Sequence, residues 1–238
     1  MLRRSAAEVM AQVLARIAAA GRAGVVLDID DTLIDCRYRK RRVLVEFANQ
    51  TEIRRNFPRE AAAIGGLKLA DMRYRVVDVL AEQGIADDAF AAAILDDWLS
   101  RYFSNSYLAD DVAFPGAVDF VTRLHDAGAR IIYLTGRDEP GMGAGTRLGM
   151  ERCGFPVGTG TEFVLKADPA LPDVEFKADA IRRLALSGPL VAALENESRN
   201  LNAMAAAIPG LLCVLRETLC TPDPPEPVAG TLLLAHFV

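Results

Sequence analysis

The segment Val25-Val26-Leu27-Asp28-Ile29-Asp30 constrains this chain most, because an apolar run rich in β-branched residues leads straight into carboxylates. A run of this kind predicts a strand of a parallel sheet that is buried on both faces. The acidic residues come at its carboxyl end, which is the edge where open α/β sheets build their ligand sites. This strand therefore predicts both the fold class and the place of a functional site.

Later segments alternate between helix and strand. Apolar strands are expected at 129–134, 190–194 and 211–215, and a helical segment precedes each of them. Shorter strands are expected at 162–165 and 231–237. Strands that alternate with helices imply an α/β fold with a doubly wound parallel sheet.

A long helical stretch interrupts this alternation. Residues 36–112 follow a helical pattern throughout. We therefore expect residues 1–35 and 113–238 to form the α/β core, and residues 36–112 to form a helical insert that follows the first strand. The apolar spacing at 5–20 predicts a further helix that packs onto the core.

Composition argues against several classes of protein. The 238 residues carry 27 basic and 32 acidic side chains, a net charge of -5, which argues against nucleic acid held by a basic surface. The longest uncharged apolar run, 203–215, is broken by Pro209 and is shorter than the roughly 18 residues that cross a membrane. Four cysteines without CxxC spacing indicate reduced thiols of a cytoplasmic protein rather than a zinc site. Neither composition nor pattern indicates an oligomeric state.

The motif Asp28-Ile29-Asp30-Asp31-Thr32-Leu33 is the strongest chemical signal. Side chains two residues apart on a strand point to the same side, so Asp28 and Asp30 can face one site. Two carboxylates this close need a compensating cation, and a hard divalent ion such as Mg²⁺ suits oxygen ligands. The ordinary alternative is a solvated acidic turn followed by a helix that Thr32 caps.

Three further segments fall at the same edge of the expected sheet. Thr135, Gly136 and Arg137 follow an apolar strand and offer a hydroxyl and backbone N–H groups to phosphoryl oxygens. Lys177 can place a positive charge near developing negative charge. The segment LENESRN at 194–200 supplies oxygen ligands. Each segment alone has an ordinary structural explanation, but together they indicate one site.

With these motifs the chain resembles the haloacid dehalogenase superfamily, most specifically its phosphohydrolase branch. The resemblance covers about residues 25–215 and rests on DIDDTL at 28–33, YLTGR at 133–137, Lys177 and LENESRN at 194–200, in the family's order. It implies a Rossmann-like core whose helical insert is a cap over a small phosphorylated substrate. The function it implies is Mg²⁺-dependent hydrolysis of a phosphomonoester.

The resemblance also implies roles for individual residues. Asp28 would attack phosphorus and form an aspartyl-phosphate, and Asp30 would act as general acid and then as general base. Mg²⁺ would bind an Asp28 oxygen, the Asp30 carbonyl and the last acidic motif. The implied catalytic residues are Asp28, Asp30, Thr135 and Lys177, and the implied substrate-binding residues are Thr135, Gly136, Arg137 and Lys177.

Two assignments differ from the family's pattern or stay open. The last motif usually carries aspartates, but Glu195 and Asn196 stand here, and either could complete the metal site. Lys166 competes with Lys177 for the role of the catalytic lysine. We favour Lys177, because it begins the helix before the next strand, whereas Lys166 lies in an expected loop ahead of Pro169.

Asp30 favours hydrolysis of phosphate esters within the superfamily, because the dehalogenases and phosphonate-cleaving members do not use an aspartate at this position. Two alternatives stay open. One is a regulatory phosphate-binding protein whose altered last motif has removed turnover. The other is a phosphotransferase that passes the aspartyl-phosphate to an acceptor other than water.

Weaker features have ordinary explanations. The basic run at 37–42 is typical of the solvated start of a helix, although it could also steer a phosphorylated substrate. The run Gly141-Met142-Gly143-Ala144-Gly145 does not open a βαβ unit, so it predicts a flexible loop beside the site. A group of aromatic residues is expected to pack inside the insert or against the core: Trp98, Tyr102, Phe103 and Tyr107.

Overall fold

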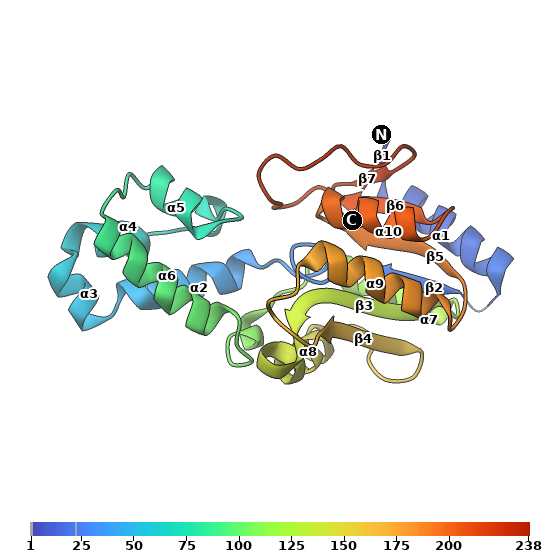
Figure 1. Ribbon diagram of the computed structural model, residues 1–238, viewed down its shortest axis with the longest axis horizontal. Coiled ribbons are helices and arrows are strands. Elements are labelled where there is room, and N and C mark those ends of the chain that lie inside the picture. Colours follow the sequence, from blue (N-terminus) through green and yellow to red (C-terminus); the bar gives the residue numbers. More distant parts are fainter. Residues whose placement is uncertain (1, 22) are drawn as a thin grey trace.

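The computed structural model describes residues 2–21 and 23–238, which form a sheet flanked by helices and a group of helices beside it (Figure 1). The strands are β1 (Leu2–Arg4), β2 (Gly24–Leu27), β3 (Arg130–Asp138), β4 (Thr161–Lys166), β5 (Leu190–Glu195), β6 (Leu212–Arg216) and β7 (Leu232–Leu234). The helices around the sheet are α1 (Ala6–Ala20), α7 (Ala117–Asp126), α8 (Glu139–Cys153), α9 (Asp173–Ala185) and α10 (Ser198–Ala207).

All seven strands are parallel and lie in the order β1-β7-β6-β5-β2-β3-β4. The predicted doubly wound parallel sheet is therefore confirmed. The chain proceeds from β2 to β3 and β4 on one side, and from β5 to β6 and β7 on the other. This reversal places a switch point between β2 and β5, and the loops that follow these strands diverge there to leave room for a ligand.

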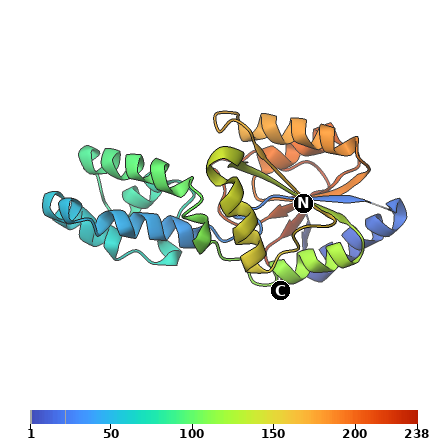
Figure 2. The same ribbon diagram turned by 90° about the horizontal axis from the view of Figure 1, so that it is seen from below.

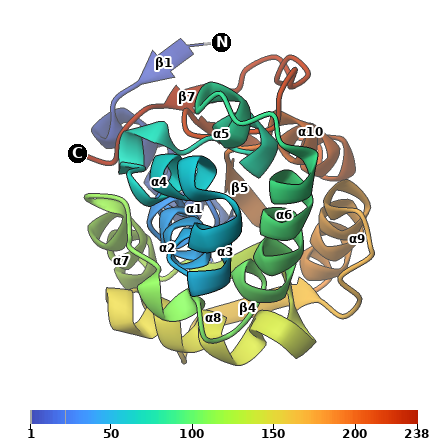
Figure 3. The same ribbon diagram turned by 90° about the vertical axis from the view of Figure 1, so that its left-hand side faces the viewer.

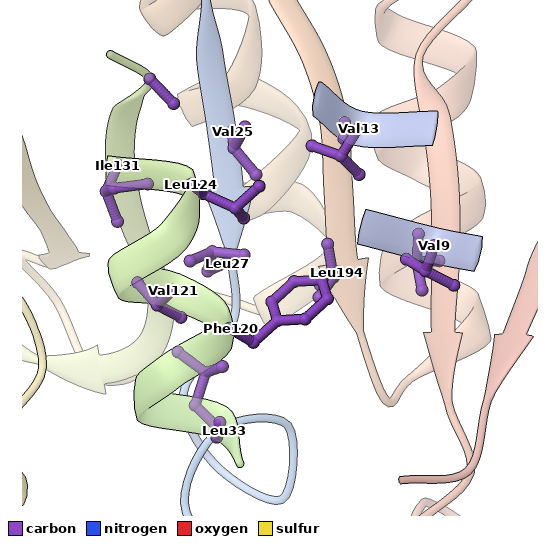
Figure 4. Close-up of a cluster of buried hydrophobic side chains, with 14 of the residues drawn as sticks. Val9, Val13, Val25, Leu27, Leu33, Phe120, Val121, Leu124, Ile131 and Leu194 are labelled. Atoms are coloured by element: carbon purple, nitrogen blue, oxygen red, sulfur yellow. The ribbon is translucent and has the colours of Figure 1, made fainter. Parts of the chain in front are cut away.

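Helices cover both faces of the sheet (Figure 2). Alternate residues of β2 point to opposite faces, so Val25 and Leu27 pack under α1 and α7 while Val26 packs under α9 and α10. Figure 4 shows the first of these clusters, in which Phe120 of α7 and Val13 of α1 lie over the strands. These buried faces fix where β2 and β5 end, and with them the positions of the acidic motifs.

The segment between β2 and β3 forms a separate group of helices with its own apolar cluster, which includes Phe47, Ile64 and Phe90. Its helices are α2 (Arg37–Ala48), α3 (Thr51–Asn56), α4 (Pro58–Gly65), α5 (Val76–Glu82) and α6 (Asp88–Tyr102), with 3-10 turns at Leu69–Asp71 and Leu108–Asp110. Figure 3 shows this helical insert in front of the sheet. Its two connections to the core run side by side, since Asp35 N–H donates to the Val112 carbonyl (2.8 Å).

Several element boundaries differ from the sequence predictions. The strand expected at 231–237 is limited to β7, and the short edge strand β1 was not expected. α9 begins at Asp173, so Lys177 lies within the helix rather than at its start. Lys166 is the last residue of β4 and not part of a loop. In the described part of the chain, no helix is long and apolar enough to span a membrane.

The glycine-rich segment 141–145 is helical, so the prediction of a flexible loop is wrong. Asp138 caps α8 by accepting a hydrogen bond from Gly141 N–H (2.6 Å). Gly141, Gly145 and Gly149 lie four residues apart and face the end of the insert. A Cβ at Gly145 would lie 2.7 Å from the Asn105 carbonyl oxygen. The glycines therefore allow the backbone of α8 to approach the insert closely.

We expect Gly145→Ala to lower the free energy of unfolding by about 2 kcal/mol, because its Cβ would press on backbone atoms. Gly143→Ala is the matched control on the same helix, since its Cβ would meet only flexible side chains, first that of Glu139. The control should be neutral or more stable by up to about 1 kcal/mol through helix propensity. Urea denaturation of both variants measures the difference, and equal stabilities would contradict the close packing.

Candidate active site

Asp28 lies directly after β2, and its backbone N–H donates to the Leu194 carbonyl of β5 (3.0 Å). Its carboxylate is almost completely buried and both oxygens have partners. Lys177 Nζ donates to Oδ1 (2.6 Å) and Thr32 Oγ1 donates to Oδ2 (2.7 Å). The ordinary alternative, a helix capped by Thr32, is not what forms, since α2 begins at Arg37 and the Thr32 hydroxyl binds Asp28.

Lys177 lies between two carboxylates. Its Nζ is 2.6 Å from Asp28 Oδ1 and 2.6 Å from Glu195 Oε2. Burial alone would lower the pKa of Lys177, but the two carboxylates outweigh burial and raise it, so the ammonium is retained. Burial, followed by the charge of Asp28, raises the pKa of Glu195 to about 8. Lys177 is thus the shared counter-ion of the loops after β2 and β5.

Asp30 faces a different set of donors. Arg137 binds it with two hydrogen bonds, Nε to Oδ2 (2.7 Å) and Nη2 to Oδ1 (2.8 Å). Arg39 Nη2 and Cys36 Sγ also donate to Oδ1, at 2.6 and 2.8 Å. Burial would raise the pKa of Asp30, but Arg137 and then Arg39 outweigh it and hold the pKa well below its usual range. Asp30 is therefore a fixed anion in this arrangement.

Arg39 and Lys40 belong to the basic run that we expected to be solvated or to steer substrate. Both are buried. Arg39 pairs with Asp30 and, at 3.6 Å, with Asp111, and Lys40 Nζ donates to Asp31 Oδ2 (3.0 Å). Sequence reasoning missed these residues as part of the site.

A signal for them was present in the helical spacing of α2. Arg39 is four residues before Val43 and Lys40 is four residues before Leu44, so each shares a helix face with a buried apolar residue. Asp31 also contributes, because its left-handed backbone (φ 54°) turns the loop so that its carboxylate points away from Asp28 toward Lys40.

Residues 135–137 lie at the carboxyl end of β3 and bring Arg137 to the site. The Arg137 guanidinium binds the carboxylates of Asp30 and Asp111. Arg137 Nη2 donates to Asp111 Oδ2 (2.6 Å) in addition to its bonds to Asp30. Thr135 is fully buried, and its Oγ1 accepts from Arg137 N–H (3.3 Å). Gly136 lines the cavity, where a Cβ would clash with the carboxylate of Asp173.

The two candidate lysines occupy different surroundings. Lys177 contacts Asp28 directly, as described above. Lys166 pairs with Asp173 (2.9 Å) and donates to the carbonyls of Pro169 (3.2 Å) and Leu171 (3.1 Å). Lys177 is thus the partner of Asp28, whereas Lys166 holds the loop before α9 through its hydrogen bonds to the carbonyls of that loop.

The residues after β5 divide between the site and a neighbouring loop. Glu195 is fully buried, and its second oxygen accepts from Glu197 N–H (3.1 Å). Asn196 Oδ1 accepts from Thr32 Oγ1 (3.2 Å), while its Nδ2 donates to the Leu219 carbonyl (2.6 Å). Glu197 binds the N–H and hydroxyl of Thr221. Asn196 and Glu197 therefore anchor the loop at 217–231 as well as lining the cavity.

A metal ion fits a set of oxygens near Asp28. Asp28 Oδ2 and Asn196 Oδ1 converge, because both lie within hydrogen-bond distance of the Thr32 hydroxyl, at 2.7 and 3.2 Å. The Asp30 carbonyl accepts no backbone hydrogen bond from the described residues. One carboxylate, one amide and one carbonyl oxygen are hard ligands that suit Mg²⁺. Glu195 Oε2 binds the Lys177 ammonium and its Oε1 accepts from Glu197 N–H, whereas the one partner of Asn196 Oδ1 among the described residues is the Thr32 hydroxyl, so Asn196 suits this set better than Glu195.

A metal ion at this position would need backbone and amide oxygens as well as carboxylates. Within residues 2–21 and 23–238, no group of three or more His, Cys, Asp or Glu side chains could hold a metal ion. The oxygens open onto a cavity of about 460 Å³ between the core loops and the helical insert. A cavity of this size accommodates a small organic molecule.

Comparison with protein families identifies the chain. The model of the haloacid dehalogenase-like hydrolases matches residues 23–207, which is most of the sequence. The chain belongs to the haloacid dehalogenase-like hydrolases. The resemblance inferred from the motifs is thereby confirmed, including membership of a hydrolase family. A comparison with curated proteins gave no match.

Several solved structures share the fold of this chain. A Clostridium difficile protein named as a phosphatase has a TM-score of 0.58 at 12% identity, covering 90% of this chain and 95% of that one. A haloacid dehalogenase-like family protein from Streptococcus pneumoniae has a TM-score of 0.54 at 10% identity, with coverages of 89% and 93%. CbbY from Rhodobacter sphaeroides, solved with phosphate, has a TM-score of 0.51 at 19% identity, with coverages of 91% and 95%.

We expect Lys177→Met to lower the free energy of unfolding by about 3 kcal/mol or more, because it leaves Asp28 and Glu195 buried without their counter-ion. Lys166→Met is the matched control, since its partner Asp173 is half exposed, and it should lose about 1 kcal/mol. Chemical denaturation of the two variants measures the difference. Similar losses would contradict the central position of Lys177.

Asn196→Asp should lower the free energy of unfolding by about 1–3 kcal/mol without divalent metal, because a carboxylate oxygen would face the Leu219 carbonyl. It should also loosen the loop at 217–231, which hydrogen exchange measures. Asn202→Asp is the control, because Asn202 Nδ2 makes a similar bond to the Glu226 carbonyl (2.8 Å) at an exposed position. An Asn196→Asp variant as stable as this control would contradict the anchoring role.

Proposed function

We propose that the protein is a metal-dependent phosphomonoester hydrolase that acts through an aspartyl-phosphate on Asp28. The observation that carries this proposal is the position of Asp28. Its carboxylate lies at the switch point of the sheet, lines the cavity and is oriented by Lys177 and Thr32. The phosphatase names of structural neighbours and the phosphate bound to CbbY support a phosphorylated substrate.

Asp28 would attack phosphorus and so divide the displacement into two steps. Burial raises the pKa of Asp28, and the Lys177 ammonium opposes this shift, so Lys177 would favour the ionised nucleophile and offset charge on the phosphoryl group as it transfers. Arg137 and Arg39 hold Asp30 as an anion in this arrangement, so Asp30 would have to lose hydrogen bonds from them and take up a proton before it could protonate the leaving oxygen. It would later take a proton from the attacking water. Gly136 and Arg137 line the cavity beside Asp30 and would position the phosphoryl oxygens, with Thr135 supporting them from behind.

Asp28, the Asp30 carbonyl and Asn196 would hold Mg²⁺, which when bound would act as a Lewis acid toward the phosphoryl oxygens. Asn196 supplies an oxygen without a negative charge, so this ligand set carries one carboxylate rather than two. Lower ligand charge weakens divalent-cation binding. We therefore expect the protein to need a higher Mg²⁺ concentration than an aspartate at position 196 would require.

We also propose that the helical insert is a cap over a core formed by residues 1–35 and 113–238. Its residues Arg39 and Tyr74 line the same cavity as Asp28, so the insert closes the site from above the sheet edge. Such a cap excludes water other than the attacking molecule and retains the substrate during both steps.

A phosphate-binding protein without turnover is the second candidate, and one observation favours it. Asp30 already accepts hydrogen bonds from Arg39, Arg137 and Cys36, which leaves it poorly placed to receive and donate a proton. A phosphotransferase would use the same aspartyl-phosphate, and its rate would depend on an added acceptor.

The hydrolase proposal predicts that acetyl phosphate and p-nitrophenyl phosphate are hydrolysed in the presence of Mg²⁺ and that chelation abolishes the activity. Asp28→Asn should lower kcat by about 10³-fold or more, since it removes the nucleophile. Asp35→Asn is the control, because Asp35 is a buried acid of the same loop that pairs with Arg37 outside the cavity. Equal rates for the wild type and Asp28→Asn would refute the proposal.

A further inference from the structure

The wall that the insert contributes to the cavity is aromatic. Tyr74, Trp98, Tyr102 and Phe103 all line it. Trp98 and Tyr102 stack with their centroids 4.2 Å apart, and Phe103 meets Tyr102 edge-on at 4.9 Å. The expected packing role holds for Trp98 and Tyr102, which are buried in the apolar cluster of the insert. Phe103 contacts Tyr102 edge-on, and Lys40 Nζ lies 5.3 Å from the centroid of the Tyr74 ring, but both residues remain partly exposed.

Tyr74 and Phe103 leave large apolar surfaces uncovered. Their residues are 37% and 48% exposed, although both lie at the cavity. Burying an aromatic ring is strongly favourable, so two such rings at one cavity are suited to contact with an apolar ligand. Met142 and Pro169 extend the apolar lining onto the core side. The cavity therefore has an apolar region as well as the charged region around Asp28.

The charges at the cavity leave little attraction for a second anionic group. Each of the five cations that line it has a carboxylate partner: Arg39 and Arg137 with Asp30, Lys40 with Asp31, Lys166 with Asp173, and Lys177 with Asp28. Seven carboxylate residues line the same cavity. A carboxylate or a second phosphate on the substrate would therefore have to compete with these carboxylates for a cation. The cations of the basic run at 37–42 that reach the cavity are thus unsuited to hold such a group.

We propose that the substrate is a monophosphate ester whose leaving group is neutral and aromatic and packs against the ring wall of the insert. This inference rests on the proposed function, and it specifies the leaving group for the same site. The phosphoryl group lies toward Asp28 and Lys177, while the leaving group lies against Tyr74 and Phe103. A planar ring matches this wall because stacked and edge-on contacts are available to it.

Three esters of primary alcohols test the proposal, because their similar leaving groups make the comparison report on binding. The leaving group of benzyl phosphate is aromatic and neutral, and that of glucose 6-phosphate is a neutral polyol. The leaving group of phosphoglycolate carries a carboxylate, which is a second anionic group. We expect kcat/KM with Mg²⁺ to be at least about tenfold higher for benzyl phosphate than for the other two. A preference for glucose 6-phosphate or phosphoglycolate, or no preference, would overturn the proposal.

Two variants test whether the aromatic wall of the insert causes the preference for benzyl phosphate. Phe103→Ala should raise KM for benzyl phosphate about fivefold to tenfold, and this increase should exceed the increase for acetyl phosphate, whose leaving group is too small to reach the wall. Leu99→Ala is the control, because Leu99 lies in the last turn of α6, which ends just before Phe103, is 64% exposed and does not line the cavity. Equal effects of the two variants on KM for benzyl phosphate would overturn the proposal.

A binding measurement separates this inference from the hydrolase proposal. If neither acetyl phosphate nor any ester is hydrolysed, the proposed function fails, and calorimetry with benzylphosphonate and methylphosphonate then tests the wall alone. Benzylphosphonate that binds at least fivefold more tightly, with the advantage lost in Phe103→Ala, would support an aromatic ligand. Equal affinities, or an advantage that Phe103→Ala retains, would overturn it.

Discussion

The buried ion pairs of Lys177 with Asp28 and Glu195 are the interaction on which the site depends. They join the ends of β2 and β5 through a side chain of α9, so two consecutive elements, α9 and β5, meet the distant β2 at one ammonium. Two carboxylates could not be buried this close without it, because burial and mutual repulsion both favour their neutral forms. The same ammonium is what would make Asp28 usable as a nucleophile, so stability and reactivity at this edge of the sheet share one cause.

A second ionic cluster connects the insert to the core. Arg39 from α2 and Arg137 from β3 share the carboxylates of Asp30 and Asp111, which belong to the two connections between these parts. Two cations and two anions balance, so the cluster can be buried without excess charge. It also fixes the insert against the cavity, because displacement of α2 would leave Asp111 and Asp30 with Arg137 alone.

The sequence predicted those parts of the fold that follow from apolar patterning. The strands that became β2, β3, β5 and β6 were evident, and the carboxyl ends of β2 and β5 placed Asp28 and Asn196 in one region. Patterning did not predict that α8 includes residues 141–145, because glycines that lower helix propensity are retained there for close approach to Asn105, a tertiary contact. The burial of Arg39 was also missed, because a basic run is usually solvated and only its carboxylate partners, distant in sequence, make burial possible.

Asn196 shows how a neighbouring loop can determine the chemistry of a site. Its amide donates to the Leu219 carbonyl and its oxygen points toward Asp28 through Thr32, so one side chain both anchors the loop at 217–231 and faces the cavity. An aspartate could do only the second, since it has no hydrogen to donate when ionised. The amide is therefore explained by the loop it holds, without any loss of the oxygen that a hard cation needs. The site is one unit less negative with Asn196 than it would be with an ionised aspartate at this position.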